Sequence, residues 1–268
     1  MRRSLRTRSI VVATTAVVVV FGLLVVGITS SPGWPTIKAT FFDAHHAREA
    51  FPAILEGFWL NVKMFLIAEP LILVLALLVA LARQARAPWL APVRVLAVAY
   101  TDVFRGIPTI LLVVLFAFGM PVLQLQGIPQ SGFFWATVAL VLSYGAYVAE
   151  VFRAGIESIH PSQVASAEAL GLGRGQAMRY VVVPQAVRRV IPPLLNDFVS
   201  LQKDTALVSS VAVFDAMFAA RDYANYNFNY TPIVVVAGFF VVMTVPLARY
   251  TDWLQARYRQ RELAGAVR

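Results

Sequence analysis

QVASAEALGLGRGQAMRYVVVPQA, residues 163–186, is a polar segment punctuated by glycine that separates two long apolar runs. It is too polar to cross a lipid bilayer, yet too regular for a solvated loop. Val164, Ala167 and Leu170 recur at the spacing of one side of a helix. Gly171 then ends that helix, because glycine accepts a left-handed backbone. The segment therefore predicts a short helix with a small apolar stripe, a glycine turn and a second helix.

The ends of these two helices also have sequence signals. Ser162 can cap the first helix by accepting a hydrogen bond from its free amides, and a start at Pro161, capped from further back, is the alternative. The second helix is expected to run from Arg174 to about Val182. Pro184 then ends or kinks it, because proline has no amide hydrogen.

The composition places the chain in a membrane. Of its 268 residues, 59% are hydrophobic and 14% are charged, whereas about a quarter of the residues of a soluble domain carry charge. The chain has no cysteine, and its three histidines lack a zinc-binding spacing, so we expect no metal site. The basic residues form no stripe interleaved with exposed aromatics, so no nucleic-acid partner is expected.

Apolar runs long enough to cross a bilayer occur six times. A bilayer core about 30 Å thick requires about 20 apolar residues in a helix. An open sheet would leave backbone groups unpaired in lipid, and the runs lack the alternation of a barrel wall. We therefore predict an all-α integral membrane protein with about six transmembrane helices and a cytoplasmic helix-turn-helix segment, which either docks against a partner or lies on the membrane surface as an amphipathic helix. The runs are 10–29, 58–82, 97–122, 133–152, 194–214 and 232–251.

The distribution of basic residues predicts the orientation. Most of the 23 Lys and Arg residues lie at the two ends of the chain or in the connections after the second and fourth runs. Because positively charged connections stay on the cytoplasmic side, both termini are expected in the cytoplasm, in a multi-pass protein of the cell inner or plasma membrane. The basic residues on the opposite side are Lys38, Arg48 and Arg221.

The first apolar run also allows a second interpretation. The arginines before it are typical of a signal peptide, but the run is longer than a signal peptide requires and no cleavage site follows. We therefore expect this run to be retained as an anchor. The stretch from Ser30 to Phe51 is interpreted as an external loop, with His45 and His46 solvated rather than bound to metal.

Charged residues inside the predicted spans require an explanation, because a charge at the centre of a membrane helix costs about 2.5–3.5 kcal/mol on insertion scales. Asp102 and Arg105 are three residues apart and are expected to pair just before Pro108 interrupts the helix. Glu150 has Arg153 as a partner at the same spacing.

The fifth run is expected to have one polar side that faces the bundle or a cavity. Asn196, Ser200 and Lys203 repeat at helical spacing, and so do Asp197, Ser200 and Asp204. Two interpretations stay open for the charged residues: they line the path of a zwitterionic substrate, or they are structural ion pairs and groups that reach toward the interface. The candidate path residues are Asp102, Arg105, Glu150, Asp197, Ser200, Lys203 and Asp204, and Lys63 and Glu69 carry the same ambiguity.

The segment at 163–186 resembles the EAA loop of ABC-transporter permeases. The pattern of that loop is Glu-Ala-Ala, three residues, Gly, nine residues, an aliphatic residue, any residue, an aliphatic residue and Pro. Its spacing is kept here by Ala165-Ser166-Ala167, Gly171, Val181, Val183 and Pro184. The stretches FRGIP (104–108), YGAYVAEVFRAGIESI (144–159) and VVVPQAVRRVIPPLLNDFVSLQKDTALVSSVAV (181–213) resemble permeases of polar amino-acid uptake systems, and the similarity extends over about 55–215.

The resemblance implies a permease domain at 55–252 with the EAA loop at about 161–184, an N-terminal tail, extra transmembrane helix and external loop at 1–54, and a cytoplasmic tail at 253–268. It implies the permease subunit of an ATP-driven importer of a polar amino acid, which itself performs no covalent chemistry and holds no cofactor. The implied partners are ABC ATPase subunits that bind ATP and Mg²⁺, a second permease copy or a homologue, an extracytoplasmic solute-binding protein and the lipid bilayer. The residues implied to couple to the ATPase are Ala165, Ser166, Ala167, Glu168, Leu170, Gly171, Gly173 and Arg174.

One position departs from the family pattern, which begins with Glu where this chain has Ala165. If Ser162 is the cap, position 165 is where a capping-box carboxylate would bond the amide of the cap. Its absence then costs about 0.5–1 kcal/mol of local helix stability. Glu168, one turn later, is expected to take over a contact with a basic group of the ATPase.

An ion-coupled secondary transporter of amino acids or amines is the main alternative. Such transporters typically show repeated halves, and this sequence has no clear repeat. A membrane-embedded enzyme is a further alternative, but it would require paired acids or a Ser/His arrangement, and the spans contain no convincing one.

Overall fold

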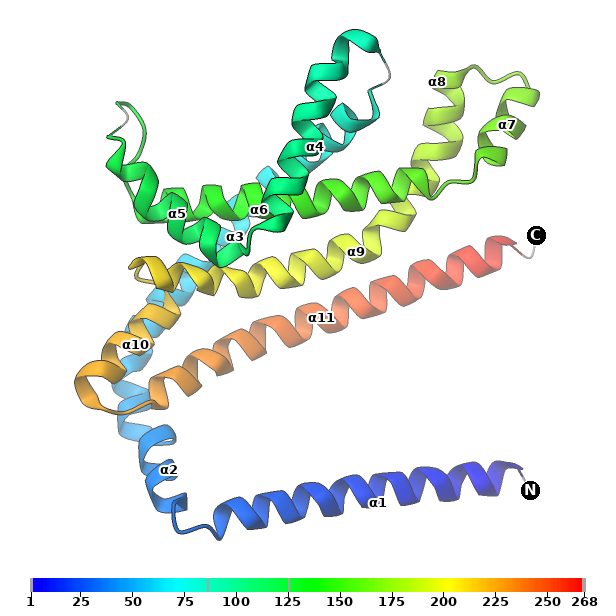
Figure 1. The fold of residues 1–268 in the computed structure, drawn as a ribbon. Coiled ribbons are helices and arrows are strands. Elements are labelled where there is room, and N and C mark those ends of the chain that lie inside the picture. Colours follow the sequence, from blue (N-terminus) through cyan, green and yellow to red (C-terminus); the bar gives the residue numbers. More distant parts are fainter. Residues whose placement is uncertain (1, 86, 125, 267–268) are drawn as a thin grey trace.

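The computed structural model describes residues 2–85, 87–124 and 126–266, and this part of the chain is helical without strands (Figure 1). The predicted all-α fold class is confirmed. In chain order the elements are α1 (Arg2–Thr29), α2 (Trp34–Phe41), α3 (Ala44–Gln84), η1 (Pro88–Leu90), α4 (Ala91–Gly106), α5 (Thr109–Val122), α6 (Gly132–Glu157), α7 (Pro161–Ala169), α8 (Arg174–Ala177), η2 (Met178–Val182), α9 (Val183–Asp204), η3 (Thr205–Val211), α10 (Ala216–Asn227) and α11 (Thr231–Ala266).

Four segments within the described residues are long and apolar enough to cross a membrane. They lie in α1, in the α2–α3 stretch, in α6 and in α11. α4 and α5 are long and apolar enough to cross a membrane only when the two are taken together as one bent span. By length and hydropathy the described residues thus contain four or five candidate spans beside the about six predicted, and the element at the fifth predicted run, α9, is not among them.

The predicted span at 97–122 is two helices that meet at a bend of 103°. α4 ends at Gly106, Ile107 and Pro108 are extended, and α5 begins at Thr109. Proline restricts the residue before it to extended conformations and donates no amide hydrogen, so the helix cannot continue through this point. The interruption expected at Pro108 is confirmed, and it turns the chain sharply (Figure 1).

The predicted span at 194–214 is also corrected. α9 begins earlier, at Val183, and ends at Asp204, after which the chain continues as the 3-10 helix η3. α9 is too polar to be among these candidate spans. It packs against α3, α6 and α11, which shield part of its polar surface, while Asn196 and Lys203 are exposed.

Most of residues 30–51 are helical, so the predicted external loop is wrong. Pro35 lies in the first turn of α2. Asp43 starts α3, because its Oδ1 accepts hydrogen bonds from the amides of His45 (2.7 Å) and His46 (3.3 Å). Proline and aspartate favour helix starts as well as loops, and this double preference explains the error.

α6 lies at the centre of the bundle, in contact with α3, α4, α5 and α9. Its inner residues are mostly small, and Ala139 and Ala146 have no exposed surface. A Cβ atom added at Gly145 would lie 2.8 Å from Cδ2 of Leu75 and from the hydroxyl of Tyr100. Small residues therefore let the helices approach closely, as is typical of membrane bundles.

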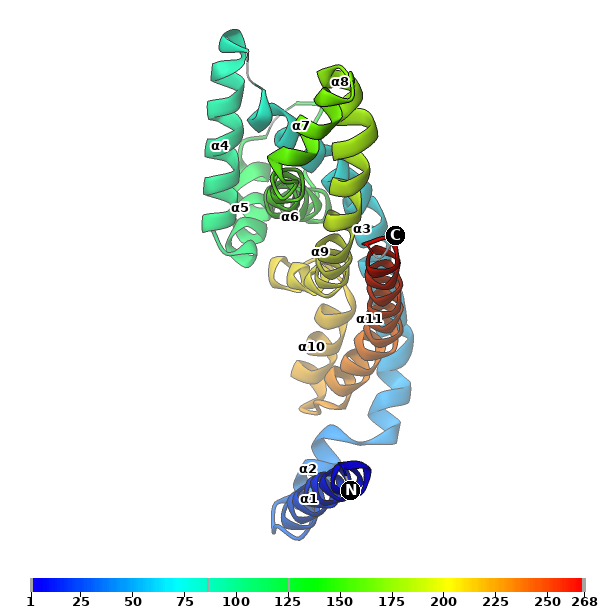
Figure 2. The same cartoon turned by 90° about the vertical axis from the view of Figure 1, so that its right-hand side faces the viewer.

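α1 stands apart from the rest of the bundle in both views (Figures 1 and 2). Its side chains from Val12 to Thr29 are all exposed, which suits a helix surrounded by lipid or by another subunit. The start of α1, the end of α11 and the α7–α8 segment lie on the same side of Figure 1, and α10 lies on the opposite side. This arrangement agrees with a topology in which both ends of the chain share the side of the α7–α8 segment.

Candidate functional site

A polar cavity of about 250 Å³ lies between α5, α6 and α9. Asp197, Ser200 and Asp204 line it from α9, at spacings that place them on one side of that helix. The prediction that these three residues share a polar side facing a cavity is confirmed. The remaining lining residues are Thr109, Tyr144 and Tyr147.

The two carboxylates of the cavity differ in their surroundings. Asp204 is held in place, because its Oδ2 accepts a hydrogen bond of 2.8 Å from the hydroxyl of Tyr144. The Oδ2 atom of Asp197 is buried and has no hydrogen-bond partner among the described residues. A buried acceptor without a donor is unfavourable. The cavity therefore offers a carboxylate that a ligand with N–H groups can satisfy.

The start of α5 forms another wall of this cavity. Thr109 lines the cavity, and its hydroxyl lies 3.0 Å from the hydroxyl of Ser143 on α6. Pro108 precedes it, and no side chain caps the helix. The first amides of a helix lack partners within the helix and carry partial positive charge. The cavity thus combines negative side chains on α9 with a positive helix end on α5.

Three other predicted polar residues lie outside this cavity. Lys203 is exposed on another side of α9. Asn196 is exposed as well, and its Oδ1 accepts from Nε2 of Gln255 on α11 at 3.4 Å. Asp102 is exposed on α4. The polar side predicted for the fifth run is therefore divided between the cavity and the outer surface of α9.

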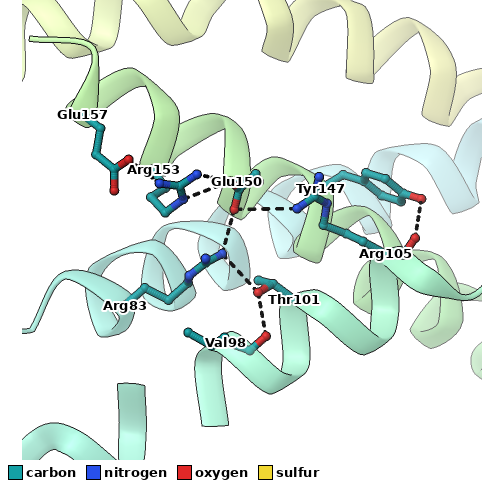
Figure 3. Close-up of polar contacts among 8 residues, drawn as sticks. All are labelled: Arg83, Val98, Thr101, Arg105, Tyr147, Glu150, Arg153 and Glu157. Atoms are coloured by element: carbon teal, nitrogen blue, oxygen red, sulfur yellow. Dashed lines mark hydrogen bonds and ion pairs between the residues drawn. The ribbon is translucent and has the colours of Figure 1, made fainter. Parts of the chain in front are cut away.

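A second polar group, the arginine cluster, joins α3, α4 and α6 (Figure 3). Glu150 is at its centre: Arg83 donates to its Oε2 at 2.7 Å, and Nε of Arg153 donates to its Oε1 at 3.0 Å. Nη1 of Arg105 lies 3.8 Å from the same carboxylate. Arg83 also donates to the hydroxyl of Thr101 at 3.1 Å. The cluster consists of Arg83, Thr101, Arg105, Glu150, Arg153 and Glu157, the last of which pairs with Arg153.

The arginine cluster confirms one predicted ion pair and corrects another. Glu150 pairs with Arg153 as expected. Arg105 is matched with Glu150 and not with Asp102, because α4 turns the arginine toward α6, where its guanidinium also lies over the ring of Tyr147. Glu150 and Arg105 do not line the cavity. Their contacts fit the structural interpretation that the sequence left open.

Lys63 and Glu69 on α3 are likewise separate from the polar cavity. Lys63 is exposed. Glu69 lines a different cavity of about 420 Å³ between α3, α9 and α11, in which its neighbours are almost entirely apolar, such as Leu73 and Phe198. The structure gives these two residues no shared site.

α7 and α8 form the predicted helix-turn-helix, referred to below as the hairpin. α7 starts with His160 as cap and Pro161 as its first residue, so the alternative start is the correct one. Position 165 is then not a capping-box position, and the cost assigned to Ala165 does not apply. At the other end Gly171 has a φ of 84°, and its amide bonds to the carbonyl of Glu168 (2.9 Å). The next amide reaches back to Ala167 (3.1 Å), which completes a Schellman motif.

The two sides of the hairpin differ in burial. Ala167 is buried and Val164 is half-buried against the cluster that contains Val182 and Ala186. Leu170 is 85% exposed at the tip. The predicted stripe is therefore not one exposed surface: its first two members anchor the hairpin to the bundle. The exposed residues on the outer side and in the turn are Ala165, Ser166, Glu168, Leu170, Gly171 and Gly173, and Arg174 follows at the start of α8.

The hairpin continues into α9 without a break. Residues Met178–Val182 form a π-helical turn, and Pro184 follows in the first turn of α9. Proline offers no amide to the preceding turn, so the backbone widens there and the helix changes direction (Figure 1). Pro184 thus kinks the helix rather than ending it, and the hairpin and the cavity-lining helix are one connected element.

This fold and this cavity define a class, that of helical membrane transport proteins. Residues 72–260 match the family model described as binding-protein-dependent transport system inner membrane component. The chain belongs to this family and is a permease subunit. Its homologues are permeases of ABC amino-acid importers.

The relatives and solved structures agree with this assignment. The chain is 33% identical to the arginine transport system permease protein ArtQ of Bacillus subtilis (strain 168), over 72% of this chain and 86% of that protein. It is 35% identical to the probable glutamine ABC transporter permease protein GlnM of the same organism, over 62% and 76%. The match to the crystal structure of an amino acid ABC transporter with histidines covers 80% of this chain and 98% of the chain in that structure. The identity is 28% and the TM-score is 0.73. The inward-facing MetNI methionine ABC transporter shares the fold, at 17% identity and a TM-score of 0.62.

Several residues of the site were not predicted from the sequence. Tyr144 and Tyr147 are three residues apart on α6, and both line the cavity. Ser143 contacts Thr109 at its edge. The signal for these residues was available, because polar side chains at helical spacing interrupt an otherwise apolar run. Arg83, which joins α3 to the arginine cluster, had no such signal. It lies at the end of α3, and a basic residue at the cytoplasmic end of a spanning helix is expected in any case.

Proposed function

We propose that this chain, with a second copy or a homologue, forms the pathway through which an ATP-driven importer moves a polar amino acid, and that the polar cavity holds the ammonium group of the cargo. The observation that carries the proposal is the pair of carboxylates on one wall of the cavity, Asp197 and Asp204. Oδ2 of Asp197 has no donor in the described structure. An ammonium group supplies both the N–H donors and the charge that this wall requires.

The start of α5 suits the other end of the same cargo. Thr109 at the start of α5 lines the cavity, no side chain caps this helix, and a helix start attracts a carboxylate, as in other transporters. An α-amino acid carries both groups. The names of two relatives refer to arginine and to glutamine, which are polar amino acids. Among the described residues no Lys or Arg lines the cavity, so an acidic side chain on the cargo is disfavoured.

Coupling to ATP is assigned to the hairpin. Its inner side is anchored through Val164 and Ala167, while Leu170 and Glu168 face outward. An ABC ATPase pair that binds ATP and Mg²⁺ docks on this outer side in the cytoplasm, and a solute-binding protein delivers the cargo on the α10 side. Movement of the ATPase pair then tilts the hairpin, and α9 carries that movement to the cavity.

Uptake into proteoliposomes tests the proposal. The complex of this chain with its ATPase and solute-binding protein is screened with each of the twenty common L-amino acids in the presence and absence of ATP. We expect ATP-dependent uptake of a polar, non-acidic amino acid. Asp197→Asn should lower the uptake rate about tenfold or more, because the charged hydrogen bond to the ammonium group is lost.

Asp102→Asn is the matched control, because this carboxylate lies on a spanning element but outside the cavity. It should transport like the wild type. Uptake driven by an ion gradient without the ATPase would overturn the importer assignment. Equal uptake by Asp197→Asn and Asp102→Asn would overturn the role of the cavity.

A further inference from the structure

A third cavity, the joint pocket, lies between the helix bundle and the hairpin. Its volume is about 330 Å³. One wall is formed by Arg83 and Gln84 at the end of α3 and by Glu157 at the end of α6. The other wall is formed by Val164 of the hairpin and by Met178 and Val182 of the π-helical turn. The pocket therefore bridges the two parts that must move relative to each other if the hairpin transmits motion.

The polar wall carries a donor that has no acceptor. The Nε2 atom of Gln84 is buried and makes no hydrogen bond to any described residue. Beside it, the contacts of Arg83 with Glu150 and Thr101 use only Nη1 of the guanidinium. An arginine has five N–H donors. This corner of the pocket is thus suited to an anionic acceptor such as a carboxylate.

Glu157 provides the opposite charge in the same pocket. Arg153 contacts its Oε2, and more than half of the Glu157 side chain is exposed. Donors at one point, a carboxylate at another and an apolar wall between them match a zwitterion with an attached side chain. A simple anion would be repelled by Glu157, and a simple cation by Arg83.

We propose that the joint pocket is a second, regulatory binding site for an α-amino acid on the hairpin side of the membrane. The carboxylate of the ligand binds Gln84 and Arg83, its ammonium group binds Glu157, and its side chain packs on Val164, Met178 and Val182. The ligand contacts the bundle and the hairpin at once, so its binding holds the hairpin in one position and slows transport. This inference rests on the proposed function, because the regulated step is the movement that drives import.

Inhibition from the hairpin side tests the inference. Proteoliposomes are prepared with the hairpin side facing the bath and with the solute-binding protein and labelled cargo inside. Transport from the lumen to the bath is started with ATP. The cargo amino acid identified in the uptake screen, unlabelled, is then added to the bath, and in separate samples each of the other common L-amino acids is added. The wild type should be inhibited by the cargo or by another of these amino acids, and the two sets of samples show which.

Gln84→Leu removes the unpaired donor without leaving a buried polar atom. It should transport like the wild type in an empty bath and should require about tenfold more amino acid for half-inhibition. Gln130→Leu, the same substitution in the connection before α6, should behave like the wild type. The decarboxylated amine of the inhibiting amino acid should not inhibit, because it lacks the group that Gln84 and Arg83 bind.

A binding measurement separates this site from the polar cavity. In nanodiscs that carry Asp197→Asn, the amino acid should still raise the thermal unfolding midpoint, and the added Gln84→Leu substitution should abolish that rise. No inhibition of the wild type, equal inhibition of Gln84→Leu, or inhibition by the amine would each overturn the regulatory site. Failure of ATP-driven transport in an empty bath would overturn the proposed function instead.

Discussion

Glu150 shows at the scale of a single residue how this protein keeps charge inside a helix bundle. One carboxylate faces three guanidinium groups that come from three helices (Figure 3). The side chains of Arg83 and Glu150 are only 15% and 22% exposed. Removing one member of a shielded pair leaves the other without a counter-charge, which costs more than the pair itself contributes. Glu150 therefore stabilises the junction of α3, α4 and α6.

Glu150→Gln should lower the free energy of unfolding by about 2–3 kcal/mol, somewhat less than the 3–5 kcal/mol typical of a fully buried pair. Glu157→Gln is the matched control. Its carboxylate also pairs with Arg153 but is 57% exposed, so its loss should cost about 0–1 kcal/mol. The comparison is made by thermal unfolding in detergent. Equal midpoints for the two variants would contradict the central role of Glu150.

At this scale the sequence correctly predicted which polar residues share one side of a helix, but it did not predict which charged residues of different helices pair. Asp197, Ser200 and Asp204 share a side of α9 because helical geometry alone places them there. The partner of Arg105 is Glu150, which lies on another helix 45 residues later in the chain. Local spacing in the sequence cannot predict such a pair. Tertiary packing therefore decided which charges meet.

At the scale of elements, the hairpin is packed against the bundle on one side, is closed by local hydrogen bonds at its turn and exposes an apolar side chain at its tip. The Schellman motif at Gly171 closes α7, and the amide of Gly173 bonds to Oε1 of Gln176 at the start of α8 (3.0 Å). The end of α7 is thus satisfied by the chain itself, and the residue before α8 is held by a local hydrogen bond. The exposed Leu170 has no such structural role, which leaves it available for a partner.

Leu170→Ser and Glu168→Ala should both weaken the coupling of ATP hydrolysis to transport, because each alters the outer side of the hairpin on which the ATPase is proposed to dock. We expect substrate-stimulated ATPase activity of the complex to fall severalfold, while the unfolding midpoint of the permease stays unchanged. Val242→Ala, a change at a 73% exposed residue of α11 away from both proposed docking sides, is the control. Unchanged stimulated activity in both hairpin variants would refute the docking surface.

Element boundaries were predictable where one residue type has one effect. Pro108 forbids helix continuation, and the sharp bend is found there. Asp43 and Pro35 misled the interpretation of residues 30–51, because both residue types also occur in loops. α9 shows the remaining limit: hydropathy identifies spans that face lipid, whereas α9 directs part of its polar surface toward neighbouring helices and the cavity.

At the scale of the whole molecule, the arrangement predicts which surfaces face the cytoplasm. The hairpin and both chain ends share one side, and α10 lies on the other (Figure 1). The chain has no cysteine, so single cysteines report unambiguously. In intact cells, Tyr226→Cys should react with a membrane-impermeant maleimide, and Leu170→Cys should react only after permeabilisation. The reverse pattern would contradict the orientation.

Because α9 is continuous with the hairpin, a tilt of the hairpin would be transmitted along α9 and enlarged at its far end. α9 contains 22 residues, and at 1.5 Å per residue it is about 33 Å long. A tilt of about 10° at its hairpin end therefore displaces its far end by about 6 Å, roughly the diameter of an amino-acid backbone group. In the coupling proposed above, α9 pivots at the π-helical turn, and Asp204 at its far end moves farthest. The carboxylate that accepts from Tyr144 is then the part of the cavity that the proposed ATPase movement displaces most.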